Sequence, residues 1–199
     1  MKKVQRSFYE RDALTVAKEL LGKYIVHKTI EGKTVGKIVE VEAYLGTADP
    51  ASHAYHGKHT ARTAVMFGQG GHAYVYLIYG IYHCLNIVVN QECSPEAVLI
   101  RSLEPVDGVD LMKRRRHTDQ LLNLCSGPGK LCTAMGISKM QNGADLCGEA
   151  IYLLSGATVA PESIISTPRI NIDYAGEVRD LPWRFILKDN PFVSKAKKA

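Results

Sequence analysis

Helical spacing of apolar residues opens the chain. Ser7 and Glu10 have the spacing of a capping box, and Gly22 is a residue type at which helices commonly end. We therefore predict a first helix between these positions. Its buried face consists of Ala13, Ala17, Leu20 and Leu21.

Strand spacing dominates most of the remaining chain. Three segments are rich in β-branched and aromatic side chains, which favour strands: 23–45, 72–90 and 97–105. The first predicts two strands around a turn at 31–33. The second predicts two strands joined near Tyr79 and Gly80, and the third a single strand that Pro105 ends.

Loops and short helices fill the other segments. Residues 46–71 are polar and rich in Gly, His and Thr, which predicts a long loop of the kind that is usually functional or disordered. Helices are predicted over 106–117 and 126–137, and short strands alternate with turns over 149–183.

Strands thus dominate without regular strand–helix alternation. This pattern predicts an α+β fold with a largely antiparallel, curved β-sheet and flanking short helices. We expect a single domain over residues 1–193 and a basic C-terminal tail over 194–199. No apolar run has the length of a membrane span, and none follows the basic N-terminal residues, so we expect the protein in the cytosol.

Composition excludes few classes of protein. The 46% hydrophobic and 23% charged residues are ordinary for a globular protein, and a net charge of +5 permits a polyanionic partner without requiring one. The five cysteines are odd in number and include no C-x-x-C pair, which favours free thiols over disulfides or a thiolate zinc site.

The segment 38–45 could carry chemistry. Glu40, Glu42 and Tyr44 alternate with apolar residues and therefore share one face of a strand. That face is either a solvated surface or the floor of a cleft in which a sheltered carboxylate acts as a base, and the pattern alone does not decide. Arg101, in an apolar strand, would orient such a carboxylate by pairing with Glu42 or Glu40.

Aromatic and imidazole side chains gather between positions 44 and 82. The tyrosines are explained by β-propensity or by stacking on bases. The loop histidines allow a metal hypothesis, which the absence of cysteines and of an H-E-x-x-H pattern disfavours. These residues are Tyr44, Tyr55, Tyr74, Tyr76, Tyr79 and Tyr82, with His53, His56, His59 and His72.

Two glycine-rich turns and one basic run complete the candidates. GQGG at 68–71 and SGPGK at 126–130 complete neither a dinucleotide fingerprint nor a Walker loop. Backbone amides at 127–129 could hold a phosphate at a helix start, or form a plain capping turn. The run 113–116 is a solvated helix face or follows a phosphate backbone.

Taken in order, these segments resemble the alkyladenine (3-methyladenine) DNA glycosylase family over nearly the whole chain. The matching stretches are VEVEAYLG at 39–46 with the following His53, TARTAVMF at 60–67, YVYLIYGIYHCLNIVV at 74–89, LIRSLEP at 99–105 and LCSGPGKLC at 124–132. TART and GQGG depart from the family's usual loops, which affects loop geometry and base preference and leaves the catalytic set intact.

The resemblance implies a role for each matching residue. Glu42 corresponds to the general base that activates water, and Arg101 to the arginine that holds the water and the carboxylate. Tyr44, His53 and Tyr76 correspond to the groups around a flipped base, Asn86 to a pocket residue that rejects normal purines, and Tyr79 to the wedge inserted into the duplex. Arg62, Gly127 and Lys130 would lie near DNA phosphates.

The implied activity is that of a monofunctional glycosylase. It would flip alkylated or deaminated purines from double-stranded DNA and hydrolyse the N-glycosidic bond, leaving an abasic site without a strand cut. We expect no cofactor, no metal, no membrane and a monomer in the bacterial cytosol or nucleoid. The alternatives are a non-catalytic damaged-DNA-binding protein on the same fold, a zinc-dependent hydrolase using the loop histidines, and an RNA-binding module.

Overall fold

The fold is α+β with one antiparallel sheet, as predicted. The computed structural model describes residues 1–194. The strands are β1 (Tyr24–Thr29), β2 (Gly32–Tyr44), β3 (Ala73–Ile78), β4 (Tyr82–Val89), β5 (Glu96–Asp107), β6 (Ile151–Leu154), β7 (Ile164–Thr167) and β8 (Arg184–Leu187). Their order is β3-β4-β5-β2-β1-β6, and β8 pairs with both β2 and β7.

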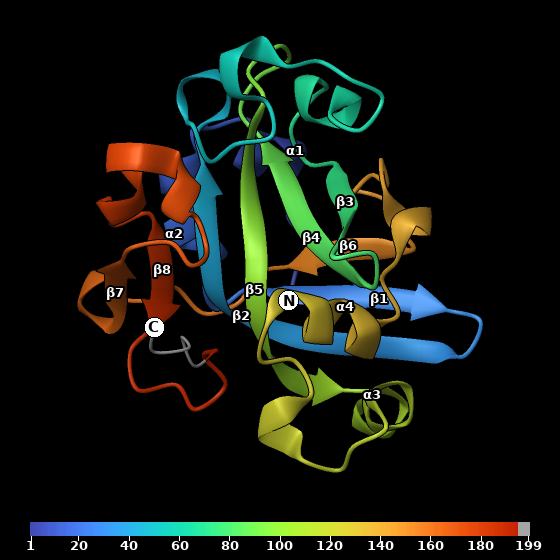
Figure 1. Cartoon of the computed structure of the whole chain (residues 1–199). Helices are drawn as coiled ribbons and strands as arrows, with labels where there is room; N and C mark the ends of the chain where they lie inside the picture. The colour runs from blue at the N-terminus through green and yellow to red at the C-terminus, as the bar shows by residue number, and fades with distance from the viewer. Residues whose placement is uncertain (195–199) are drawn as a thin grey trace.

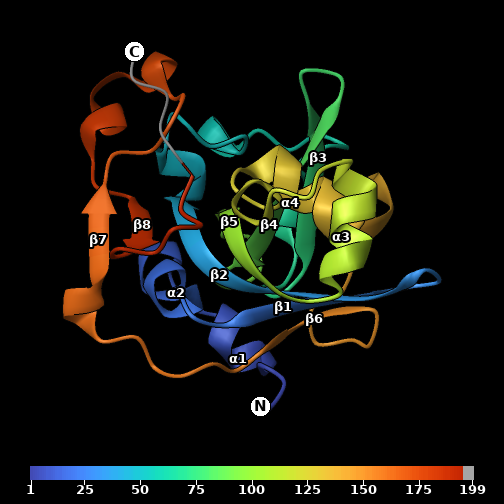
Figure 2. The same ribbon diagram turned by 90° about the horizontal axis from the view of Figure 1, so that it is seen from below.

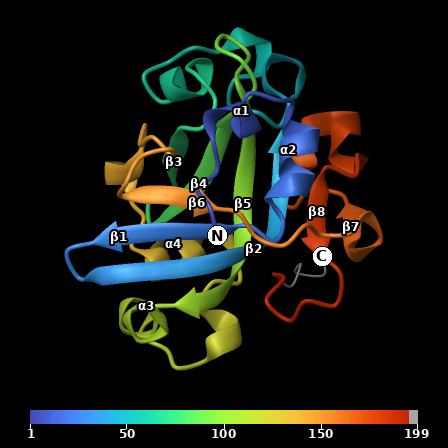
Figure 3. The same cartoon turned by 180° about the vertical axis from the view of Figure 1, so that it is seen from behind.

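Helices cover both faces of the sheet. Figures 1 and 2 show α3 and α4 on one face, and Figure 3 shows α1 and α2 on the opposite face. The α-helices are α1 (Arg6–Tyr9), α2 (Ala13–Leu20), α3 (Val109–Arg116) and α4 (Pro128–Met135). The 3₁₀ turns are η1 (Gly46–Ala48), η2 (Tyr55–Gly57), η3 (Ala64–Phe67), η4 (Leu121–Asn123), η5 (Lys139–Gln141), η6 (Pro161–Ser163) and η7 (Asp173–Asp180). No helix of the described residues has both the length and the apolar character to cross a membrane.

The first helix begins later than predicted. Asp12, not Ser7, is the N-cap of α2, and its carboxylate accepts from the backbone N–H of Thr15 at 2.9 Å. The predicted capping box is wrong because Ser7 lies inside the separate four-residue helix α1 and Glu10 follows that helix. The apolar stripe of α2 packs into the core as expected.

Strand β2 is the longest element of the sheet and changes partners along its length. Residues 32–37 pair with β1 and residues 40–42 with β8, while β5 follows its other edge. The register with β5 is irregular around Ile38–Val41, so that Val39 and Arg101 have no Cα partner there. Such irregularities bend strands and re-aim side chains.

Strand β5 does not end at Pro105, as the sequence had predicted, but continues to Asp107. Pro105 lies opposite Gly36, where the register between β5 and β2 shifts. A proline is tolerated at such an irregularity because its missing N–H is not needed for a regular ladder.

Two other predictions concern chain connections. The hairpin at Tyr79 and Gly80 is confirmed: both residues are left-handed, with φ of 53° and 72°, as a type I′ turn requires. The segment 46–71 carries three short 3₁₀ turns and no strand. Of the predicted tail, only Ser194 lies within the described residues.

Candidate active site

One face of the sheet forms the floor of a cavity of about 540 Å³. Alternate residues of three strands line it, which is the period that a half-exposed sheet face requires. They are Tyr74, Tyr76 and Ile78 of β3, Tyr82, Cys84 and Asn86 of β4, and Ala97, Leu99 and Arg101 of β5. Tyr44 at the end of β2 continues this floor.

Loop and helix segments wall the cavity. The first turn of α4, with the preceding residues 126–127, forms one wall, and residues 170–172 with Tyr174 form another. Gly129 of α4 lies against Tyr82: a Cβ at this position would approach the tyrosine to 3.0 Å. The SGPGK turn therefore packs on β4 as part of the cavity.

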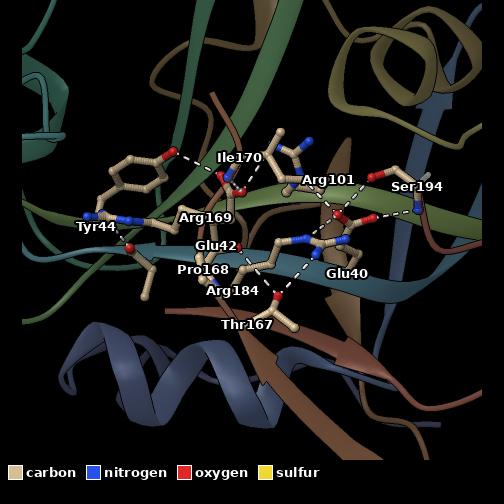
Figure 4. A network of polar contacts seen from close by, with 11 residues as sticks. Glu40, Glu42, Tyr44, Arg101, Thr167, Pro168, Arg169, Ile170, Arg184 and Ser194 are labelled. Carbon is tan, nitrogen blue, oxygen red and sulfur yellow. Dashed lines mark hydrogen bonds and ion pairs between the residues drawn. The ribbon is translucent and has the colours of Figure 1, made fainter. Parts of the chain in front are cut away.

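Glu42 does not itself line the cavity but contacts three residues that do. Its side chain has no exposed surface, and its Oε1 lies 3.2 Å from Arg101 Nη1 and accepts from the backbone N–H of Ile170 at 2.8 Å. Its Oε2 accepts from the Tyr44 hydroxyl at 2.9 Å (Figure 4). The solvated-surface interpretation of this strand face is therefore wrong, since Glu40 and Glu42 are both fully buried.

Arg169 packs against the ring of Tyr44 and is itself held by Asp49. Its guanidinium carbon lies 4.7 Å from the centre of the Tyr44 ring and 4.9 Å from that of Trp183. Asp49 holds the same guanidinium through contacts of 2.5 and 2.9 Å, and neither side chain of this pair is exposed. Burial, followed by the charge of Glu42, raises the pKa of Tyr44 well above its usual value, so the phenol stays protonated as a donor to Glu42.

His53 and two tyrosines form the aromatic part of the wall. The ring of His53 lies 4.6 Å from that of Tyr76, and its Nδ1 lies 2.9 Å from the Tyr74 hydroxyl. Arg62 stacks over Tyr76 at 4.9 Å and approaches His53 Nε2 at 3.5 Å. Burial, with smaller effects of Arg62 and Lys58, lowers the pKa of His53 to about 4, so this ring is neutral at physiological pH.

The neutral His53 has a consequence for stability. An unfolded histidine titrates near pKa 6.5, so between about pH 6.5 and 4 the unfolded state binds a proton that the folded state excludes. We expect the melting temperature to fall more steeply over this range in the parent than in His53→Gln. Thermal unfolding from pH 8 to 4 measures the difference, with the exposed His59 changed to Gln as the control. Equal slopes in the parent and His53→Gln would contradict the lowered pKa of His53.

The remaining predicted residues divide between the cavity and its surroundings. Tyr79 lies at the cavity mouth with 77% of its surface exposed, and Asn86 is 4% exposed and donates from Nδ2 to the Tyr74 carbonyl at 3.2 Å. Gly127 and Lys130 line the cavity, whereas Arg62 lines a neighbouring hollow of about 500 Å³.

The loop histidines do not converge. His56 contacts the Tyr55 ring at 3.8 Å and His59 the Phe67 ring at 4.6 Å, while His53 faces the tyrosines of the cavity. Among the described residues, no group of three or more His, Cys, Asp or Glu side chains is arranged to hold a metal ion. The zinc-hydrolase hypothesis therefore lacks its ligand set in this part of the chain.

Several site residues were missing from the sequence prediction. Arg169 and Ile170 come from a segment predicted only as short strands alternating with turns, and Tyr174 from the same segment lines the cavity. Cys84 was noted only as a free thiol, although the period-two pattern of β4 puts it on the same face as Asn86. That period was the available signal for Cys84, whereas the sequence around Arg169, Ile170 and Tyr174 gave no signal of a site.

Comparison with known proteins identifies the family of this chain. The model of the family described as Methylpurine-DNA glycosylase (MPG) matches residues 7–191. The chain belongs to this family. The sequence-based recognition is confirmed, and the protein is a DNA repair glycosylase.

Bacterial relatives match the glycosylase over nearly its full length. A protein of Alkaliphilus oremlandii is 52% identical over 201 residues, covering 97% of this chain and 99% of the relative. A protein of Clostridium acetobutylicum is 49% identical over 204 residues, covering 98% and 99%. Both carry the name "Putative 3-methyladenine DNA glycosylase".

Proposed function

We propose that this glycosylase excises alkylated or deaminated purines from double-stranded DNA by hydrolysis, with Glu42 as the general base. The observation that carries the proposal is the pairing of buried Glu42 with Arg101 at 3.2 Å, beside a cavity with aromatic walls. A cavity of about 540 Å³ is in the range of small-molecule sites and suits a single flipped nucleotide.

Glu42 has one oxygen suited to receive a proton. Oε1 is occupied by Arg101 and the Ile170 amide, whereas Oε2 accepts only from the Tyr44 hydroxyl among the described residues. Oε2 therefore has lone-pair capacity for a water molecule that attacks the sugar. The ionised carboxylate would also stabilise the positive charge that develops on the sugar as the bond breaks.

The aromatic wall suits a cationic base. Tyr44, His53 and Tyr76 offer ring faces or edges, and stacking on aromatic rings contributes about 1–3 kcal/mol per base. A neutral His53 adds no repulsion toward an alkylated, positively charged purine, and electron-rich tyrosine rings attract such a cation. Asn86 would help to reject normal purines that carry an exocyclic amino group.

Tyr79 is proposed as the wedge that fills the space left by the flipped nucleotide. It stands exposed at the tip of the β3–β4 hairpin. Tyr79→Ala is expected to weaken binding to a lesion duplex by about 10- to 100-fold, equivalent to the loss of about 1–3 kcal/mol of stacking. Because the side chain makes little contact within the fold, the melting temperature should stay within about 2 °C of the parent. Fluorescence anisotropy and thermal unfolding measure both; undiminished affinity for the lesion duplex would remove Tyr79 from the wedge role.

We propose a monofunctional reaction that leaves an abasic site. Lys130 lines the cavity, and its Nζ contacts Asn123 Oδ1 instead of Glu42 or Arg101. Water activated by Glu42 thus remains the favoured nucleophile. A strand nick, or an adduct trapped by borohydride and lost in Lys130→Met, would overturn this part of the proposal.

The decisive experiment is excision from a duplex carrying one hypoxanthine and from methylated duplex DNA. Base release that leaves alkali-labile sites, from double-stranded DNA in preference to single strands, is the expected result. Gel filtration of the same preparation tests the expected monomer. Binding of lesion duplex without base release from either substrate would favour the non-catalytic damaged-DNA-binding alternative.

A further inference from the structure

Glu40 is a second fully buried carboxylate, one pleat away from Glu42 on β2. It accepts four hydrogen bonds: from Arg101 Nε at 2.9 Å, from Arg184 Nε at 2.8 Å, and from the hydroxyl and backbone N–H of Ser194 at 2.8 and 2.7 Å. Figure 4 shows it between the two guanidiniums and Ser194. These donors come from β5, from β8 and from the C-terminal segment.

The two carboxylates and two guanidiniums form one neutral buried group. Burial opposes ionisation of Glu40, but the charges of Arg101 and Arg184 and the Ser194 hydrogen bonds outweigh it and hold the pKa of Glu40 below its usual value. Arg184 is fixed in turn by Thr167, whose hydroxyl accepts from Nη1 at 3.0 Å. An arrangement with this many satisfied donors fixes the side chains that it contains.

Glu40 determines which nitrogen of Arg101 faces Glu42. Arg101 is the unpaired residue at the irregularity of the β5–β2 register, so ladder pairing does not fix its position. Glu40 takes Nε, which leaves Nη1 to approach Glu42 Oε1 at 3.2 Å. Without Glu40, the planar guanidinium would be free to turn its bidentate edge toward Glu42 and compete for Oε2.

We propose that Glu40, held by Arg184 and Ser194, is a positioning residue that keeps Arg101 in the orientation in which it supports Glu42 during base excision. The inference rests on the proposed roles of Glu42 and Arg101. Of the residues that donate to Glu40, only Arg101 lines the cavity, whereas Arg101, Ile170 and Tyr44, the three contacts of Glu42, all line it; Glu40 therefore acts through Arg101.

If Glu40 served only to stabilise the fold, its substitution would lower stability without changing the rate of the chemical step. A positioning role instead lowers the rate of the chemical step while affinity for lesion duplex is retained, and a conservative change that keeps the hydrogen bond to Glu40 preserves that rate.

The test uses single-turnover excision at saturating enzyme, with the better of the two substrates named above. For Glu40→Gln we expect a fall of about 10- to 100-fold at neutral pH, the scale of effect that follows from a misplaced catalytic group, with affinity for lesion duplex within about twofold of the parent. Ser194→Ala, which leaves Glu40 charged, should give a smaller fall in the same direction, and Ser194→Thr should restore the rate because it keeps the hydroxyl.

Ser102→Ala is the matched control. Ser102 is a fully buried serine opposite Glu40, and its hydroxyl has no hydrogen-bond partner among the described residues. It should excise at the parental rate. If Glu40→Gln does not fold, the Ser194 pair carries the test alone.

The possible results separate the inference from the proposed function. A parental rate in Glu40→Gln overturns the inference, as does a parental rate in Ser194→Ala if only that variant folds. A rate loss explained wholly by weaker binding also overturns it. A parental rate in Glu42→Gln, run alongside, would instead show that the proposed general base is wrong.

Discussion

Glu42→Gln is expected to lower the single-turnover rate of base excision by about 10²- to 10⁴-fold, the usual contribution of a general acid or base. The amide is isosteric with the carboxylate, and its oxygen can still lie beside Arg101 Nη1 and accept from the Ile170 N–H. Its NH₂ group would face the Tyr44 hydroxyl, which can reverse its role and accept. The variant should therefore fold and bind lesion duplex while losing the proton acceptor for water.

The measurement pairs excision with binding on the same duplex. Glu104→Gln is the matched control, because it makes the same chemical change at a partly exposed position of β5. It should excise at the parental rate. A Glu42→Gln protein that excises at more than one tenth of the parental rate would rule out a general-base role for this residue.

Asp49→Asn is expected to cause the largest loss of stability in the set, about 3–5 kcal/mol in the free energy of unfolding. The substitution leaves the guanidinium of Arg169 without its counter-charge at a position where neither side chain is exposed. One asparagine cannot accept both Arg169 contacts and also the backbone N–H groups of Leu45 and Ala51 that Asp49 now serves. A loss of this size is a large part of the stability of an ordinary domain.

Urea unfolding measures the loss, with Asp107→Asn as the control. Asp107 pairs with Lys33 at 2.8 Å, but about half of each side chain is exposed. Exposed pairs contribute at most about 1 kcal/mol, so the control should unfold near the parental midpoint. Similar midpoints for the two variants would show that the Arg169–Asp49 pair is dispensable.

The same variant should disturb the site, because Arg169 packs against Tyr44 and precedes the Ile170 amide that donates to Glu42. Loss of stability and loss of excision should therefore appear together in Asp49→Asn. They should separate in Glu42→Gln, in which only excision is lost. The contrast distinguishes a residue that builds the site from one that reacts in it.

Local pattern was sufficient to predict the strands that form the cavity floor. The alternation in β2 correctly put Glu40 and Glu42 on one face, and the residues around Tyr79 and Gly80 marked the hairpin. Pairing of Arg101 with a glutamate was predicted with two candidate partners. The structure shows that it contacts both.

The features of the site that the sequence did not predict depend on contacts between segments far apart in the chain. Nothing near Arg169 in the sequence indicates that Asp49 and Tyr44 are its neighbours, and nothing near Ser194 points to Glu40. The capping box failed for a different reason: Asp12, a better-placed cap, competes with Ser7 only a few residues away. Short-range rules do not rank such competitors.

At the tip of the β3–β4 hairpin, the residue that would give the highest thermal stability differs from the residue proposed to engage DNA. Tyr79 adopts a left-handed φ of 53°, which a non-glycine residue reaches at a cost of about 1–3 kcal/mol, and asparagine before glycine is the pair that such a turn prefers. Selection for heat resistance alone would therefore favour asparagine at position 79. Directed evolution of this enzyme toward thermostability should enrich Tyr79→Asn. The more stable variants should bind damaged DNA less tightly than the parent.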